Sequence, residues 1–211
     1  MKENKYDDNI FFQKYSQMSR SQQGLAGAGE WETLRKLLPD FKDKRVLDLG
    51  CGYGWHCIYA MEHGASSVVG VDISHKMLEV AKEKTHFPQV EYKCCAIEDV
   101  EFPEESFDVI LSSLAFHYVA DYEILVKKIY RILKSGGKLV FTVEHPVFTA
   151  YGTQDWHYNE KGEILHFPVD NYYYEGKRTA VFLGEKVTKY HRTLTTYLNT
   201  LLSNGFIINH I

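Results

Sequence analysis

The sequence predicts one α/β domain built on a doubly wound, mostly parallel β-sheet. Apolar runs of strand length alternate with amphipathic helical patterns from residue 45 to residue 143, and this spacing joins parallel strands through helical crossovers. The chain of 211 residues is 45% hydrophobic and 14% aromatic, which provides enough apolar surface for one sizeable core. We therefore expect residues 1–211 to form a single domain.

The composition argues against several classes of protein. The formal net charge of -4 gives no basic excess, so we expect no nucleic-acid partner. No apolar segment has membrane-spanning length and the start, MKENKYDDNI, lacks the apolar core of a secretion signal, so we expect a cytoplasmic protein with no membrane partner. The four cysteines include no C-x-x-C pair, which favours free buried thiols over a zinc knuckle or a disulfide framework. The oligomeric state stays open.

Residues 1–44 are expected to form an N-terminal cap and one helix. The first 29 residues are polar and end in GLAGAG, which is too rich in glycine for a rigid element, so we expect them to order only on contact with something else. Leucines at helical spacing follow Trp31 and predict a helix that ends at Pro39. The polar segment carries one amphipathic patch, made of Phe11, Phe12, Tyr15 and Met18.

Residues 45–143 contain five predicted strands and the helices between them. Ser74 is placed to cap one helix, and the apolar stripe from Tyr122 to Leu133 predicts another that stops at the glycines of SGG. Parallel sheets of this kind bind ligands at the carboxyl ends of their strands. The five strands are RVLDLG, SVVGVD, VEYKCC, FDVILSS and KLVFTV.

Residues 144–189 interrupt the alternation of strand and helix. Four short β-like runs separated by turn signals predict a small antiparallel insertion. Residues 190–211 return to a helix with leucines at helical spacing, followed by FIINHI, which we expect to be a sixth strand. The four runs of the insertion are EILHF, NYYY, RTAVFL and KVTKY.

The turn after the first strand, DLGCGYG, does not fit the common dinucleotide or phosphate motifs. A dinucleotide fingerprint requires a third glycine where Trp55 stands, and no Gly-Lys-Ser/Thr follows for a P-loop. Alternate glycines let the backbone lie flat against a ligand. Asp48 suits a ligand ammonium better than a phosphate, and Asp72 at the end of the second strand is placed to bind a ribose diol.

On these residues the chain resembles a class I S-adenosylmethionine-dependent methyltransferase, of the group that includes ubiquinone and menaquinone biosynthesis enzymes. The resemblance covers roughly residues 45–146 and implies a Rossmann-like fold. It also implies methyl transfer from S-adenosylmethionine to a small-molecule acceptor, with S-adenosylhomocysteine as product. The matching segments are VLDLGCGYG, VVGVDISHKML, CCAIEDVEFPEESFDVILSSLAFHYV and IYRILKSGGKLVFTVEHP.

The resemblance implies cofactor contacts at particular positions. Asp48 would face the amino group and Asp72 the ribose hydroxyls. Backbone at Ile97 and the side chain of Glu98 would contact the adenine edge, where the family commonly has Asp-Ala and this chain has Ala96-Ile97. The methionine end would contact Gly50, Cys51, Gly52 and Gly54, the adenine would pack on Ile73 and Met77, and the N-terminal patch would close over the cofactor with Tyr15 and Arg20.

Candidate catalytic residues follow the fourth and fifth strands. Ser112 and the residues up to His117 would lie under the activated methyl group, and His117 is either a general base or a packed, partly buried ring. Glu144 and His145 leave the fifth strand at the same sheet edge. A metal cluster of these two with His117 is the less favoured alternative, so we expect no metal.

Three further expectations concern the acceptor and the sheet. We expect the aromatic insertion to form a lid over an apolar or aromatic small molecule. The family sheet has a seventh, antiparallel strand, and none follows Ile211 here, so we expect it to be missing. A non-catalytic S-adenosylmethionine-binding sensor or scaffold is the alternative function, and the accepting atom is open. The expected lid residues are Tyr151, Trp156, Tyr158, Tyr172, Tyr173 and Tyr174.

Overall fold

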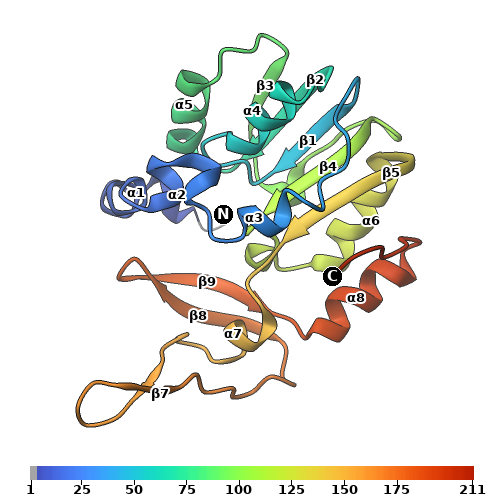
Figure 1. Ribbon diagram of the computed structural model, residues 1–211. Helices are drawn as coiled ribbons and strands as arrows, with labels where there is room; N and C mark the ends of the chain where they lie inside the picture. The colour runs from blue at the N-terminus through green and yellow to red at the C-terminus, as the bar shows by residue number, and fades with distance from the viewer. Residues whose placement is uncertain (1–3) are drawn as a thin grey trace.

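A computed structural model describes residues 4–211 and shows a five-stranded parallel sheet (Figure 1). The strand order is β3-β2-β1-β4-β5, and every neighbouring pair is parallel. The prediction of an α/β fold on a mostly parallel sheet is confirmed. The strands are β1 (Arg45–Leu49), β2 (Ser67–Asp72), β3 (Val90–Cys94), β4 (Phe107–Ser113) and β5 (Leu133–Thr142).

Helices cover both faces of this sheet. Helices α4 (Trp55–Glu62) and α5 (His75–Lys84) contact β2, whereas α6 (Tyr122–Ile132) contacts β5 and α8 (Leu194–Ser203). Ser74 caps α5 as predicted, because its hydroxyl accepts the Met77 N–H at 3.2 Å. Short 3₁₀ turns, η3 (Ile97–Asp99) and η4 (Phe116–Tyr118), follow β3 and β4. Within residues 4–211 no helix combines the length and apolarity needed to cross a bilayer.

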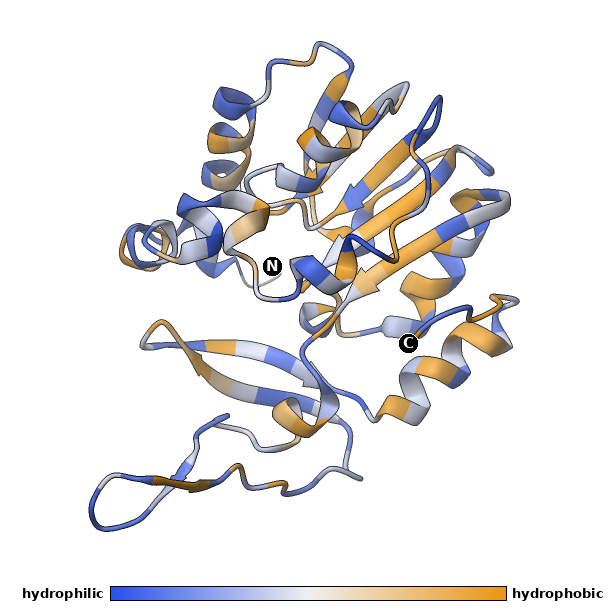
Figure 2. Cartoon of the chain, in the orientation of Figure 1, coloured by the Kyte–Doolittle hydropathy of each residue, from blue (hydrophilic) through white to orange (hydrophobic). Residues whose placement is uncertain are grey.

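Alternation along the buried strands divides the core between the two faces. Val46 and Leu111 pack with the side chains of α4, whereas Leu47 and Ile110 pack with those of α6 and α8. Figure 2 shows the central strands as the most continuously hydrophobic part of the chain. Burial of this kind on both faces holds the carboxyl ends of the strands in fixed positions.

The N-terminal segment is ordered by contacts within the chain, and the expectation that GLAGAG forms no rigid element is wrong. Gly27 packs so closely on the backbone of α2 that an added Cβ would lie 2.3 Å from the Ser19 carbonyl oxygen. Glycine here permits a compact 3₁₀ turn. The elements are η1 (Lys5–Asp7), α1 (Asn9–Ser16), α2 (Ser19–Gln22), η2 (Gly24–Gly27) and α3 (Trp31–Leu34), the last ending well before Pro39.

The antiparallel insertion is confirmed, with different boundaries. NYYY is a turn and not a strand, because Asn171 has a left-handed φ of 57° and Tyr173 is exposed. A helix follows Glu144 that the sequence did not predict, with Pro146 at its first position. The elements are α7 (Pro146–Ala150), β6 (His157–Tyr158), β7 (Ile164–His166), β8 (Gly176–Phe182) and β9 (Glu185–His191).

The predicted sixth strand is wrong for the described residues. Residues 206–211 form no ladder with β5, and the sheet ends there. Phe206 and Ile208 pack against the core, and the ring of Phe206 lies 5.3 Å from that of Tyr130. The alternating pattern of FIINHI therefore partly buries Phe206 and Ile208 without a strand neighbour.

Candidate active site

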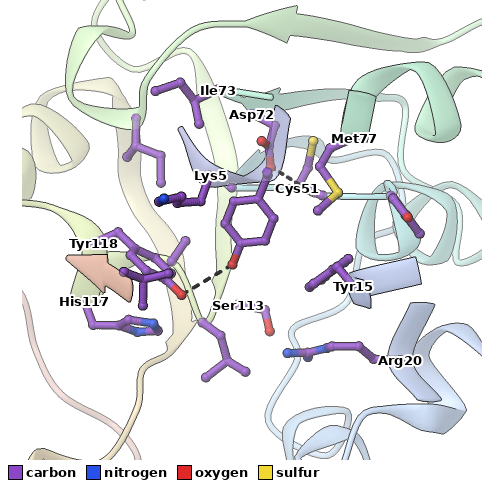
Figure 3. A pocket seen from close by; sticks show the side chains of 18 of the residues that line it. Lys5, Tyr15, Arg20, Cys51, Asp72, Ile73, Met77, Ser113, His117 and Tyr118 are labelled. Carbon is purple, nitrogen blue, oxygen red and sulfur yellow. Dashed lines mark hydrogen bonds between the residues drawn. The ribbon is translucent and has the colours of Figure 1, made fainter. Parts of the chain in front are cut away.

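A cavity of about 470 Å³ lies at the carboxyl ends of the sheet strands, where the fold predicts a ligand. Figure 3 shows Asp72 and Ile73 at one end, and His117 with Tyr118 across from Tyr15 and Arg20. Twelve of the sixteen predicted site residues line it. These are Tyr15, Arg20, Gly50, Cys51, Gly52, Asp72, Ile73, Met77, Ile97, Glu98, His117 and Glu144.

The three alternate glycines all have left-handed φ angles but differ in their surroundings. An added Cβ at Gly50 would lie 2.5 Å from the Ala115 Cβ, and one at Gly54 would lie 2.2 Å from the Tyr92 hydroxyl. At Gly52, a Cβ would meet no atom within 4 Å. Gly50 and Gly54 therefore permit close packing, whereas Gly52 leaves space at the cavity wall. Gly54 does not itself line the cavity and begins α4.

The Asp72 carboxylate joins the glycine turn to α5. Its Oδ2 accepts the Gly52 N–H at 2.8 Å and its Oδ1 accepts the Ser74 N–H at 2.9 Å. Each carboxylate oxygen has two lone pairs, so Asp72 can still accept hydrogen bonds from a ligand. Burial raises the pKa of this carboxyl group, against the hydrogen bonds from backbone N–H groups that lower it.

Residues 4–8, which we call the N-terminal strap, cross the cavity beside Asp72. The Asp7 carboxylate accepts the Ser74 hydroxyl at 2.6 Å, and the Asn4 amide donates to the Ile73 carbonyl at 3.2 Å. Tyr6 lines the cavity, and its hydroxyl lies 3.3 Å from that of Tyr118. The strap is thus tied to the end of β2 and contributes Lys5 and Tyr6 to the cavity wall.

Asp48 lies beneath the glycine turn and does not line the cavity. Its Oδ2 accepts a weak hydrogen bond from the Cys57 thiol at 3.5 Å, and its Oδ1 has no hydrogen-bond partner among the described residues. Burial, with a smaller contribution from the charge of Asp72, raises the pKa of Asp48 to about 7. Any contact with a ligand ammonium would pass through the turn or a water molecule.

Arg20 lines the cavity already paired. Its guanidinium lies 2.5 Å from Oε1 of Glu30, which also accepts the Ser113 hydroxyl at 3.2 Å. Burial raises the pKa of the neighbouring Tyr15, so this phenol stays protonated. The Arg20–Glu30 pair joins α2 to the residues that follow β4.

His117 and Glu144 meet at the other end of the cavity. The Glu144 backbone N–H donates to Nδ1 of His117 at 3.4 Å, and Nε2 of His117 lies 4.0 Å from Oε1 of Glu144. The Glu144 carboxylate accepts the Lys189 ammonium at 2.5 Å through Oε1 and the Gln154 amide at 2.8 Å through Oε2. Lys189 also donates to the Gln154 carbonyl at 2.9 Å, so the three side chains form a closed network.

The protonation states at this end follow from burial and from that network. Burial lowers the pKa of His117 to about 4, and the cations Lys189 and Arg192 add to this against the opposite effect of Glu144. His117 is therefore neutral at pH 7. Burial opposes ionisation of Glu144, but attraction to His117 and Lys189 and the hydrogen bonds from Lys189 and Gln154 outweigh it and lower its pKa. Glu144 is therefore ionised.

Two other predicted site residues do not line the cavity. The Ser112 hydroxyl is buried and donates to the Leu49 carbonyl at 2.7 Å, while its neighbour Ser113 lines the cavity. His145 is exposed and caps α7, where its Nδ1 accepts the Val147 N–H at 3.2 Å. Residues 4–211 contain no group of three or more His, Cys, Asp or Glu side chains arranged for a metal.

The cavity roof consists of the N-terminal helices and the β8–β9 hairpin, which lie side by side in Figure 1. Phe11 of α1 is fully buried against Ala180 of β8 and Val187 of β9. The six aromatic residues expected to form the lid do not line the cavity. The insertion contributes other residues instead, namely Phe182, Val187, Thr188 and Tyr190.

Sequence reasoning missed several residues of this site. Lys189 could have been found from the sequence, because it alternates with Val187 and His191 at the inward positions of a strand. A lysine at such a position requires a buried partner. Tyr6, Tyr118 and Gln154 gave no such signal, since their roles depend on how distant segments pack.

Comparison with known proteins identifies the family. The family described as "Methyltransferase domain" matches residues 47–141. A crystal structure from Listeria monocytogenes, assigned to the S-adenosylmethionine-dependent methyltransferases, is 58% identical with a TM-score of 0.83, over 86% of this chain and 85% of that chain. The structure of an S-adenosylmethionine-dependent methyltransferase from Mesorhizobium loti is 42% identical with a TM-score of 0.82, over 89% and 85% of the two chains.

A more distant similarity links the chain to a curated enzyme. The ubiquinone biosynthesis O-methyltransferase of Coxiella burnetii is 36% identical over 112 residues, which are 52% of this chain and 47% of that protein. The two solved structures, in contrast, match along most of both chains. The two solved structures and the matching domain are all methyltransferases, which is the family that the glycine turn and Asp72 indicate. The chain therefore belongs to the class I S-adenosylmethionine-dependent methyltransferases.

Proposed function

We propose that this methyltransferase modifies a small molecule enclosed between the sheet edge and the roof. The observation that supports the proposal is the single cavity that connects the glycine turn and Asp72 at one end with His117 and Glu144 at the other. Its volume of about 470 Å³ is in the range of small-molecule sites, and the N-terminal helices and the β8–β9 hairpin cover part of it.

The residues at the first end fit S-adenosylmethionine. Gly52 offers open space at the wall, where backbone can approach the methionine part, and Asp72 has free lone pairs for the ribose hydroxyls. Ile73 and Met77 present apolar surface for the adenine, with Ile97 and Glu98 at its edge. Tyr15 and Arg20 cover the methionine part from the N-terminal side, and we assign Asp48 to an indirect role beneath the turn.

Bound S-adenosylmethionine supplies an electrophilic methyl group whose leaving sulfur needs no proton. The protein's task is therefore to hold the acceptor in line with that methyl group, and positioning of this kind contributes roughly 7–11 kcal/mol. Ser113, Leu114, Ala115 and His117 line the cavity at this point. His117 is neutral and Glu144 ionised, so both groups are in a form able to take a proton from the acceptor.

Calorimetry with S-adenosylhomocysteine and with NAD tests the cofactor assignment first. We expect the former to bind and Asp72→Asn to weaken it by tenfold or more, because two charge-assisted hydrogen bonds are lost. Asp155→Asn, at an exposed position of the insertion, is the matched control. Binding of NAD alone would contradict the assignment. A metabolite screen with tritiated S-adenosylmethionine then tests catalysis, and transfer to RNA or protein but to no metabolite would contradict a small-molecule acceptor.

A further inference from the structure

The hydrogen-bonding pattern of His117 fixes which ring nitrogen carries its proton. A backbone N–H can only donate, so Nδ1, which receives the Glu144 N–H, is the unprotonated nitrogen. The neutral ring therefore carries its proton on Nε2. That Nε2–H group makes no hydrogen bond to another side chain or backbone group within residues 4–211, and Oε1 of Glu144 lies 4.0 Å from it.

The Glu144 carboxylate keeps unused acceptor capacity toward the cavity. Lys189 and Gln154 each occupy one lone pair, which leaves one on each carboxylate oxygen. The Lys189 side chain is 3% exposed and the Glu144 side chain 26% exposed, so the ammonium lies behind the carboxylate and the carboxylate faces the cavity. The ion pair is electrically balanced.

The 4.0 Å between Nε2 and Oε1 is too long for a direct hydrogen bond. One oxygen atom about 2.8 Å from each would bridge the two, with an angle of about 90° at that oxygen. Such an atom must accept from Nε2–H and donate to the carboxylate. A neutral hydroxyl group does both, whereas an ammonium cannot accept, and a carboxylate or an ether oxygen cannot donate.

We propose that His117 and Glu144 together bind a neutral hydroxyl group of the acceptor, so that the substrates are small phenols or aryl alcohols. This inference rests on the proposed function and names its substrate class. The rest of this end of the cavity is a surface for an aromatic body, made by Tyr6, Tyr118, Phe182 and Tyr190. The Glu144–Lys189 pair itself carries no net charge.

Lys189 and Gln154 are positioning residues in this arrangement. They do not bridge to the hydroxyl group themselves, but they fix both oxygens of the carboxylate that does. Loss of Lys189 would leave Glu144 free to rotate or to take up a proton, and a protonated carboxyl would no longer select a donor.

The test compares four probes of similar size on protein saturated with S-adenosylhomocysteine: phenol, anisole, benzylamine and benzoate. Dissociation constants come from NMR of ¹³C- and ¹⁵N-labelled histidine, with His117→Asn to assign the signal. We expect phenol to bind about tenfold or more tightly than each of the others, and the His117 spectrum at pH 7 to show a proton on Nε2 only. Equal binding of phenol and anisole, stronger binding of benzoate or benzylamine, or no binding of any probe at 10 mM would overturn the inference.

Variants separate the inference from general effects on the fold. The double variant Glu144→Met/Lys189→Met removes both buried charges together, and we expect the preference for phenol to fall to within about twofold. Lys189→Met alone should reduce the preference severalfold, whereas the exposed controls Lys186→Met and Glu160→Gln should keep it. Retention of the preference in the double variant would refute the bridge. Failure of S-adenosylhomocysteine to bind wild-type protein would instead refute the proposed function.

Discussion

Alanine at Gly54 should mainly reduce stability, whereas alanine at Gly52 should mainly weaken cofactor binding. Both glycines have left-handed φ angles, 53° and 75°, so alanine costs about 1–2 kcal/mol of backbone energy at either position. At Gly54 the new Cβ would also lie 2.2 Å from the Tyr92 hydroxyl and 3.2 Å from the Ala81 Cβ, which adds about 1–3 kcal/mol of overpacking. Gly54→Ala should therefore lose about 2–5 kcal/mol of stability.

At Gly52 the new methyl group would enter open space at the wall of the cofactor end. Gly52→Ala should lose about 1–2 kcal/mol of stability, which at about 2–4 °C per kcal/mol lowers the melting temperature by about 2–8 °C. It should weaken S-adenosylhomocysteine by about 5- to 150-fold, the equivalent of 1–3 kcal/mol of steric conflict. Thermal unfolding and calorimetry measure the two effects, with Gly29→Ala, which meets no atom within 4 Å, as control. Normal binding by Gly52→Ala would refute this reasoning.

Three further changes test the roof and the buried charges. Phe11→Ala should remove about 3–5 kcal/mol of packing energy between α1 and the β8–β9 hairpin. Limited proteolysis should then cleave the N-terminal segment faster than in wild type. Unchanged cleavage would contradict the role of Phe11 in the roof. The pKa of His117 in the folded protein, about 4, is below its ordinary value of 6.5. The free energy of unfolding therefore keeps its full value above pH 6.5 and decreases as the pH falls toward 4. His117→Asn should remove about 3 kcal/mol of this decrease, as measured by urea unfolding at a series of pH values. The pKa of Asp48 in the folded protein, about 7, is above its ordinary value of 3.8, so the wild-type protein loses stability as the pH rises from 3.8 to 7. The stability of Asp48→Asn minus that of wild type should therefore be about 4 kcal/mol larger at pH 8 than at pH 4. The same difference at both pH values would contradict the burial of Asp48 in its protonated form.

The sheet could be predicted because its strands are buried on both faces. Val68 and Val71 belong to a run of β-branched residues whose burial does not depend on a particular distant neighbour. FIINHI has the same local pattern, but a strand also needs a partner, and no residue within the segment specifies one. The same limit explains NYYY, where three tyrosines of high β-propensity occupy a turn that begins at Asn171.

The cofactor end of the site could be predicted and the acceptor end only in part. Gly52 and Asp72 follow adjacent strands, so topology alone brings them together. The partners of Glu144 come from a loop and from β9, 10 and 45 residues away along the chain, and no periodicity links them to β5. Residue type identified His117 and Glu144 as candidates, but their protonation states required the packing around them.

The pairing of Phe11 with Val187 also has a consequence for synthesis of the protein on the ribosome. The two residues are separated by about 176 positions, so at roughly 5–20 residues per second the nascent chain carries α1 for roughly 9–35 s before its partner strand exists. All five strands of the sheet precede β9 along the chain and are therefore synthesised earlier. During this interval the apolar side of α1 has no β9 strand to pack against and is available to chaperones.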